Sequence, residues 1–361
     1  MPVLARMVAT PLCVEVGSGA VARLAPLLTD RRISREGHIA LVVGPGLGSE
    51  VITAAEPGLS NAQVFQVDDG ALSTATRLAA SFRGGSFDAV VGVGGGRTLD
   101  VAKHAATQVG LPMVSVATSL AHDGLASPVA SLEGDGHKGS YGVQMPIAVI
   151  VDLDFVARSP IAMRRSGIGD ALSNMSALAD WRLASDVFGE EVDGLAAAFA
   201  STASEAVLGH DSSVDDPAFL ATLADSLILS GLAMAVAGSS RPCSGGEHEI
   251  VHAIDRLFPA TASHGELVGL ATLFCTHLRD DAPLFAQLGA CLRRHGLPRR
   301  PAEIGLSDVE FAAAVALAPS TRPDRFTILE QLEMDETEVA RSTASFTERV
   351  ESEPLSPEDG R

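Results

Sequence analysis

Residues 87–103 read FDAVVGVGGGRTLDVAK, an apolar run that ends in a cluster of glycines and continues with helical spacing. The first half, 87–94, predicts a buried strand, and a helix is expected from about Thr98. Glycines let a backbone approach a ligand closely, and a helix N-terminus offers free N–H groups and a positive dipole to an anion. A tight turn that needs positive φ would explain one glycine, but three in succession favour a phosphate-binding turn. The standard GxGxxG fingerprint at the first strand is absent.

Residues 1–152 repeat this alternation of strand and helix. The expected strands lie at 12–17, 38–44, 62–67, 87–94, 112–118 and 146–153. The expected helices lie at 19–29, 47–56, 71–83 and 98–109. Apolar strands separated by helices are typical of a doubly wound α/β fold, in which helices cover both faces of a parallel sheet. We therefore expect an α/β domain over residues 1–155.

The pattern changes after Asp152, where long segments rich in Ala and Leu follow one another with helical spacing. No segment there has the short, β-branched character of a strand. This predicts an all-α second domain over residues 156–350. The tail 351–361, ESEPLSPEDGR, is rich in Pro, Ser and acidic residues and is expected to be disordered.

The composition excludes several classes of protein. The chain has 45 acidic and 26 basic residues, a net charge of −19, which would repel nucleic acid and anionic membranes. No apolar run reaches the ~18 residues of a membrane span, and the N-terminus lacks the apolar segment of a signal peptide. Four scattered cysteines form no CxxC pair, as expected for reduced thiols. We expect a cytoplasmic protein without nucleic-acid or membrane partners.

A second polar loop, SVATSLAHDGLASPVASL (115–132), follows the strand expected at 112–118. Ligands of open α/β sheets bind beyond the carboxyl ends of the strands, so this loop and the glycine turn would lie side by side if their strands are neighbours. Thr118 and Ser127 could then bind a cofactor, and Asp123 a substrate hydroxyl or the nicotinamide side. The competing interpretation is that His122-Asp123-Gly124 forms only a β-turn.

The helical half contains HEIVH (248–252), a match to the HExxH zinc motif of metalloproteases. On a helix His248 and His252 share one face, and His264 follows shortly after a turn expected at Phe258 and Pro259. Three histidines so close together favour a metal site. Asp170 would be a fourth candidate, although an Asp at a helix start is more often an N-cap.

The residues that follow HEIVH do not fit a metalloprotease. The extended motif HExxHxxGxxH requires Gly at 255 and His at 258, where this chain has Asp255 and Phe258. A glutamate as third ligand on a following helix could only be Glu266, which is unusually close. A glycine-rich cofactor turn also has no role in a protease.

The motifs GGGRTLDVAK (94–103), SLAHDGLASPVASL (119–132), GIGDALSNMSALADW (167–181), SGGEHEIVHAID (244–255) and HGELVG (264–269) occur in a fixed order. Together they resemble the family of iron- or zinc-dependent alcohol dehydrogenases that includes glycerol dehydrogenase and dehydroquinate synthase. Within that family they are most similar to sn-glycerol-1-phosphate dehydrogenases. The resemblance covers residues 12 to 275 and implies a dehydroquinate synthase-like fold.

The resemblance also implies a set of site residues. The metal ligands would be Asp170, His248 and His264, with Zn²⁺ preferred and Fe²⁺ an ion that similar ligands accept. His252 and Asp123 would contact the substrate, and His252, with a pKa near neutrality, could pass on a proton. The expected contacts to NAD or NADP are Gly94, Gly95, Gly96, Arg97, Thr98, Asp100, Thr118, Ser119 and Ser127.

By the same resemblance, the reaction would be hydride transfer between NAD(P)H and a small polyol phosphate, most closely dihydroxyacetone phosphate to sn-glycerol 1-phosphate. The phosphate needs a cation, and Lys138, Arg165 and Arg241 are the candidates. The alternatives are a carbocycle-forming lyase of the dehydroquinate synthase type, which usually has Glu in place of Asp170, and a non-catalytic relative. Members of the family commonly self-associate, so a homo-oligomer is expected.

Overall fold

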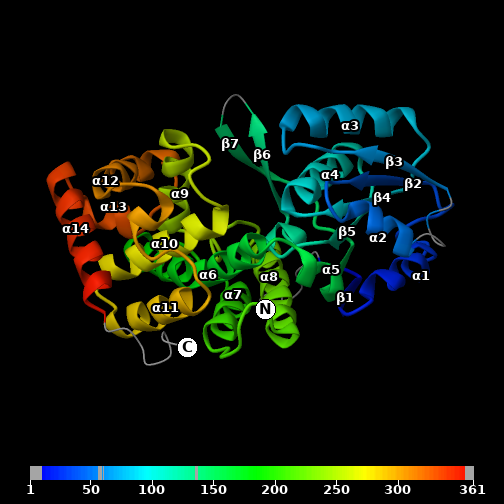
Figure 1. The fold of residues 1–361 in the computed structure, drawn as a ribbon. Helices are drawn as coiled ribbons and strands as arrows, with labels where there is room; N and C mark the ends of the chain where they lie inside the picture. Colours follow the sequence, from blue (N-terminus) through cyan, green and yellow to red (C-terminus); the bar gives the residue numbers. More distant parts are fainter. Residues whose placement is uncertain (1–9, 56–58, 60, 135–136, 354–361) are drawn as a thin grey trace, which may run out of the picture.

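The structure is a computed structural model that describes residues 10–55, 59, 61–134 and 137–353. Figure 1 shows a sheet with its helices on one side of the molecule, in blue to cyan, and a group of helices on the other, in green to red. The expected combination of an α/β half and an all-α half is confirmed. The two halves share one continuous apolar core, because the cluster that contains Val90 of the sheet also contains Leu172 and Phe274 of the helices.

The sheet has six strands in the order β1-β8-β5-β4-β2-β3, and all its strand pairs are parallel. The strands are β1 (Cys13–Gly17), β2 (Ile39–Val43), β3 (Ala62–Gln66), β4 (Ala89–Gly94), β5 (Met113–Ala117) and β8 (Ala148–Asp152). Every residue of the four inner strands is buried, whereas the edge strands β1 and β3 are partly exposed. Each expected strand is present, and its ends lie within two residues of those observed.

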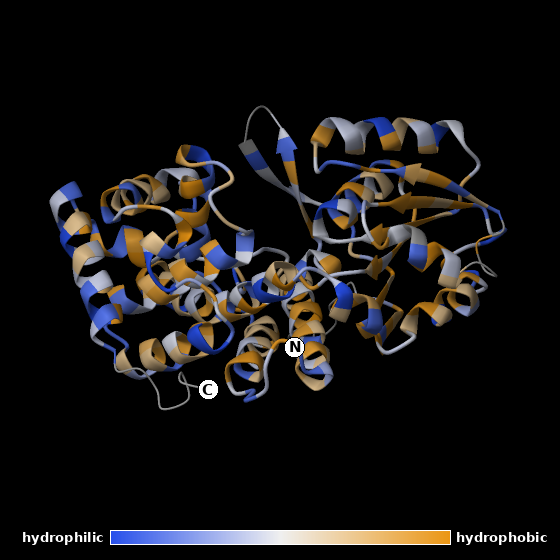
Figure 2. Cartoon of the chain, viewed as in Figure 1, coloured by the Kyte–Doolittle hydropathy of each residue, from blue (hydrophilic) through white to orange (hydrophobic). Residues whose placement is uncertain are grey.

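Helices cover both faces of the sheet. Alternate residues of a strand point to opposite faces, so Val42 of β2 belongs to the apolar core on one face of the sheet, and Leu41 to the core on the other. The inner strands are accordingly mostly apolar, as the hydropathy colours of Figure 2 show. The covering elements are the 3₁₀ turn η1 (Ala20–Arg23), α1 (Leu24–Leu28), α2 (Gly48–Ala55), α3 (Leu72–Gly84) and α4 (Gly96–Val109).

Two of the expected helices differ in detail. The helix expected from Thr98 begins at Gly96, because Gly95 is its N-cap and the glycine turn is shorter than the sequence indicated. The helix expected at 19–29 is a 3₁₀ turn followed by a five-residue α-helix.

An antiparallel hairpin was missed by the sequence analysis. It consists of β6 (Val129–Gly134) and β7 (His137–Gly142) and projects from the sheet towards the helical half (Figure 1). Near its end Lys138 Nζ lies 3.4 Å from Asp255 Oδ2 of α9 (Gly246–Leu257). The short β7, HKGSYG, lacks the apolar alternation of a strand, so nothing in the local sequence indicated it.

The second half contains no strand among its described residues, 153–353. Its helices are α5 (Leu153–Arg158), α6 (Ile161–Phe188), α7 (Gly194–Leu208), α8 (Pro217–Ala237), α9, α10 (His264–Leu278), α11 (Ala282–Arg294), α12 (Asp308–Leu317), α13 (Ile328–Leu332) and α14 (Glu336–Ser352), with 3₁₀ turns η4 (Pro301–Ile304) and η5 (Ala318–Thr321). The boundary expected between 155 and 156 falls within α5. Residues 351 and 352 are helical and were wrongly assigned to the tail, and 354–361 lie outside the described residues.

Helix α8 is long and apolar enough to cross a membrane by composition, with a mean hydropathy of 1.9. The sequence analysis found no such run because Asp225 interrupts it. In the structure 61% of the apolar window is buried against other elements. A core helix of a soluble protein passes the same test, so this helix is weak evidence for a membrane span.

Helices α6 and α10 approach each other so closely that their backbones are in contact. A Cβ atom built on Gly169 would lie 1.9 Å from the carbonyl oxygen of Gly265, and one on Gly265 would lie 1.7 Å from the carbonyl oxygen of Ser166. Only glycine permits this approach. Since Asp170 follows Gly169 and His264 precedes Gly265, the contact brings these two side chains together.

Candidate metal and cofactor site

Three side chains from three helices converge at the edge of the helical half. Asp170 lies in α6, His248 in the first turn of α9, and His264 is the first residue of α10. One ligand atom from each lies within 4.8 Å of the others. Asp170 Oδ1 is 3.4 Å from His264 Nε2 and 3.9 Å from His248 Nε2. The N-cap interpretation of Asp170 is wrong, because α6 begins at Ile161 and Asp170 lies well inside the helix.

This cluster fits a divalent metal ion. Two ligands at about 2.1 Å from a tetrahedral ion are about 3.4 Å apart, close to the separations between Asp170 and the histidines. With neutral imidazoles the set has a net charge of −1. The other oxygen of Asp170, Oδ2, accepts a 2.8 Å hydrogen bond from the backbone N–H of Asp123, which orients the carboxylate. Imidazole and carboxylate suit both Zn²⁺ and Fe²⁺.

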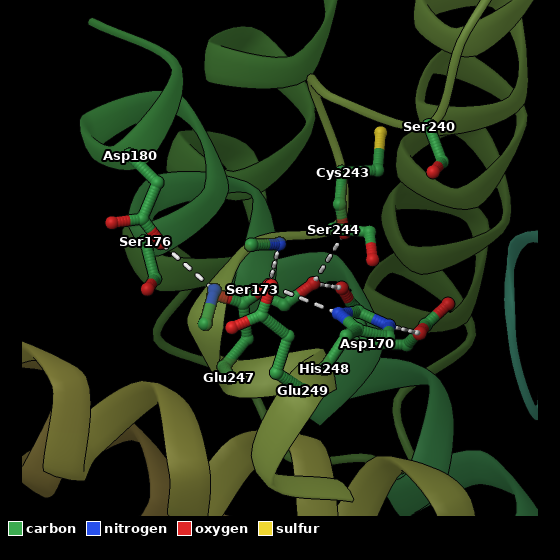
Figure 3. A network of polar contacts seen from close by, with 12 residues as sticks. Asp170, Ser173, Ser176, Asp180, Ser240, Cys243, Ser244, Glu247, His248 and Glu249 are labelled. Atoms are coloured by element: carbon green, nitrogen blue, oxygen red, sulfur yellow. Dashed lines mark hydrogen bonds and ion pairs between the residues drawn. The ribbon is translucent and has the colours of Figure 1, made fainter. Parts of the chain in front are cut away.

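Glu247 orients His248 from behind. Its side chain is fully buried, and Oε1 lies 2.9 Å from His248 Nδ1 and accepts a hydrogen bond from the N–H of Gly245 (Figure 3). Burial raises the pKa of Glu247, but the hydrogen bond and charge of His248 outweigh it, so the pKa is lowered and the carboxylate is ionised. A carboxylate on Nδ1 leaves Nε2 free as a metal ligand. No pattern in the sequence indicated this role for Glu247.

We expect Glu247→Gln to weaken metal binding by about 10–100-fold, the usual effect of losing such a carboxylate. The matched control is Glu249→Gln in the same helical turn. Burial raises the pKa of Glu249 to about 9, so this carboxyl is already uncharged at neutral pH and the amide replaces it with little change. Titration of the apo-proteins with Zn²⁺ measures both affinities. Equal affinities for the two variants would contradict the role of Glu247.

His252 lies one turn after His248 and lines the same cleft, but it does not belong to the metal cluster. Burial and the charge of Arg322 lower the pKa of His252 to about 2. The expectation of a pKa near neutrality is therefore wrong. His252 is a neutral imidazole. It can donate or accept a hydrogen bond with a substrate, but it carries no extra proton that it could release as an acid.

Asp123 lies in the 3₁₀ turn η3 (Asp123–Leu125), which replaces the β-turn considered from the sequence. His122 caps this turn by accepting a 3.0 Å hydrogen bond at Nδ1 from the N–H of Gly124. Burial, followed by the nearby charge of Asp170, raises the pKa of Asp123 well above its usual range. Its side chain lines the cleft, as a substrate-binding role requires.

The glycine turn and the loop after β5 lie side by side, as expected, because β4 and β5 are paired. A Cβ atom on Gly96 would lie 1.9 Å from His122 Nε2, and one on Gly95 would lie 2.9 Å from Ser119 Oγ. Glycine is therefore required at these two positions partly because the two loops pack closely against each other. Neither residue has a positive φ, so the tight-turn interpretation does not explain them.

The remaining cofactor candidates are divided between the cleft and the interior. Arg97, Asp100 and Ser127 line the cleft. The side chain of Asp100 is committed to the protein, with Oδ1 3.0 Å from Lys103 Nζ and Oδ2 accepting a hydrogen bond from Ser131 N–H. The candidates that are buried and do not line the cleft are Gly94, Thr98, Thr118 and Ser119. The cofactor contacts of all these residues stay predictions.

One cleft of about 1380 Å³ contains the site. Its lining includes Arg97 at the start of α4, the loop around Asp123, the hairpin residue Lys138, and the metal cluster. Small-molecule pockets usually measure about 300–1,000 Å³. This cleft is therefore large enough for a dinucleotide and a small substrate together.

Comparison with known proteins places this arrangement in a family. Residues 15–160 match the pattern described as iron-containing alcohol dehydrogenase. A glycerol-1-phosphate dehydrogenase (NAD(P)+) of Hyperthermus butylicus is 36% identical over 324 residues, 88% of this chain and 92% of that protein. The chain belongs to the iron-containing alcohol dehydrogenase family. The resemblance identified from the motifs is confirmed.

Another relative of similar sequence and two solved structures agree with this assignment. The glycerol-1-phosphate dehydrogenase (NAD(P)+) of Archaeoglobus fulgidus is 41% identical over 255 residues, 69% of this chain and 73% of that protein. A crystal structure of a probable glycerol dehydrogenase from Sinorhizobium meliloti 1021 has a TM-score of 0.80 at 21% identity and covers 96% of this chain and 99% of that one. The sulfoacetaldehyde reductase from Bifidobacterium kashiwanohense, in complex with NAD+, has a TM-score of 0.70 at 14% identity, with 95% and 99% covered. At these identities the structures show a shared fold.

Proposed function

We propose that this protein is an NAD(P)-dependent dehydrogenase that interconverts dihydroxyacetone phosphate and sn-glycerol 1-phosphate at a divalent metal. The observation that carries the proposal is the convergence of Asp170, His248 and His264 in the cleft that Arg97, at the start of α4, also lines. The relatives, which are named glycerol-1-phosphate dehydrogenases, supply the substrate and favour a dehydrogenase over the lyase alternative.

The chain's own residues prepare the cleft for this reaction. A bound divalent ion would act as a Lewis acid on a carbonyl, and a bound nicotinamide would carry the hydride. Asp170 is held by the N–H of Asp123, and His248 by Glu247, so two ligands are oriented before any ion binds. Orienting the reacting groups in advance lowers the entropic part of the barrier. Neutral His252 faces the same cleft and can exchange a hydrogen bond with the substrate oxygens.

The absorbance of NADH and NADPH at 340 nm tests the proposal. Metal-replete protein is expected to oxidise the nicotinamide with dihydroxyacetone phosphate. With dihydroxyacetone, kcat/KM should be lower by about 10–100-fold or more, because a charged group gains about 1.5–3 kcal/mol from each well-placed hydrogen bond. Net oxidation also separates a dehydrogenase from a lyase, which regenerates its cofactor. No activity with any three-carbon ketone, despite stoichiometric metal and cofactor, would refute the proposal.

We also propose roles for the two halves of the chain and the identity of the ion and the cofactor. The α/β part, residues 1–155, would bind the dinucleotide, and the helices of 156–350 would bind metal and substrate. We propose Zn²⁺ as the ion and either NAD or NADP as the cofactor. Cytoplasmic location, a homo-oligomeric state, and the absence of nucleic-acid or membrane partners stay predictions.

A further inference from the structure

A substrate phosphate needs a cation in the cleft, and the candidates from the sequence are already committed elsewhere. Arg241 forms a two-point ion pair with Glu190. Arg165 does not line the cleft, and its guanidinium lies against Gly296. Lys138 lines the cleft but lies beside the carboxylate of Asp255.

The structure contains another cation in this cleft, Arg322, directly after the 3₁₀ turn η5. Its half-buried side chain reaches the segment that precedes α9, where Nη1 donates a 2.7 Å hydrogen bond to Ser244 Oγ. Arg325 supports the same segment from behind, since Nη1 donates to the carbonyl oxygen of Ser244 and Nη2 donates to Ser240 Oγ. Both serines are labelled in Figure 3 and line the cleft.

This corner contains two arginine cations, Arg322 and Arg325. Within the described chain, no carboxylate oxygen lies within 4.0 Å of the guanidinium of Arg322 or Arg325. Burial lowers the pKa of both side chains, and for Arg322 it outweighs the opposing charges of Glu249, Glu247 and Asp324, none of which contacts the guanidinium. Their charges also lower the pKa of His252, which places both within electrostatic reach of the substrate side of α9.

We propose that Arg322 and the hydroxyl of Ser244 form the anion subsite that binds the phosphate of the substrate. The inference rests on the proposed function, because it assigns the phosphate of that substrate to a place in the same cleft. A guanidinium presents a planar fork of donors that matches two phosphate oxygens. Ser244 lies one turn before His248 in the chain, so a phosphate bound there leaves the carbon chain to extend towards the metal cluster.

The test compares Arg322→Met with Lys138→Met, which removes another cation that lines the cleft. For each variant, kcat/KM is measured with dihydroxyacetone phosphate and with dihydroxyacetone. Arg322→Met is expected to lower the ratio of the two values by about 100-fold, mostly through KM for the phosphate ester. Arg322→Lys should restore part of the loss, since it returns the charge without the fork. Lys138→Met should leave the ratio within about twofold, since it removes only an exposed ion pair.

Binding of inorganic phosphate to the metal-replete protein, measured by calorimetry, tests the subsite separately. Wild-type protein should bind phosphate, and Arg322→Met should lose that binding while its melting temperature shows that it is folded. If phosphate binds in this way but dihydroxyacetone phosphate is not reduced, the proposed function fails and the subsite stands. Phosphate binding that Arg322→Met retains, or that wild-type protein lacks, would overturn the subsite, as would an unchanged ratio in a folded Arg322→Met.

Discussion

Asp170→Asn is expected to lower kcat/KM by about 1,000-fold or more. A Lewis acid at the reacting oxygen supplies several kcal/mol, and about 1.4 kcal/mol corresponds to a factor of ten in rate. The amide removes the only negative charge among the three ligands, so the metal affinity should fall with the activity. Metal content after dialysis and the rate of NAD(P)H oxidation measure the two effects.

The fold should survive this substitution. The amide oxygen of Asn can still accept the hydrogen bond that the N–H of Asp123 donates to Asp170. Asp215→Asn is the matched control, since it removes a carboxylate whose partner, Arg164, lies outside the cleft. That variant should keep its metal and activity. Full activity in a metal-depleted Asp170→Asn protein would show that Asp170 is not a ligand.

Gly265→Ala is expected to destabilise the helical half by about 3 kcal/mol or more, at the upper end of overpacking effects. The new methyl group would lie 1.7 Å from the backbone oxygen of Ser166, and a backbone atom cannot rotate away as a side chain can. Helices α6 and α10 would have to separate. Because that contact also holds Asp170 next to His264, metal affinity should fall together with stability. Urea unfolding and Zn²⁺ titration measure these changes.

Gly194→Ala is the control for this prediction. Gly194 is the first residue of α7, and a Cβ atom added there meets no atom within 4 Å. It should be neutral or slightly stabilising, because alanine favours a helix over glycine by about 1 kcal/mol. A Gly265→Ala protein as stable as this control would mean that the two helices can move apart without loss.

Much of the fold follows from local patterns. The buried strands β2, β4, β5 and β8 are predominantly apolar, and their alternation with helices is sufficient to indicate a parallel doubly wound sheet. That the glycine turn and the loop after β5 lie side by side depended on their strands being neighbours, and the structure shows that β4 and β5 pair. The ends of helices and the short polar strand were less predictable. The α4 helix begins two residues early because Gly95 serves as its cap, and β7 forms through pairing with β6 despite its polar sequence.

By itself, the sequence determined the sheet, the helical second half, the shared face of His248 and His252, and a short list of metal ligands. These features depend on periods of two and 3.6 residues or on ordered motifs. Tertiary structure decided the rest. Glu247 reaches His248 only because α9 begins at Gly246, and Arg322 enters the cleft only because η5 packs against that helix. Asp170 meets His264 because α6 and α10 touch at glycines, a contact between distant segments that no local period encodes.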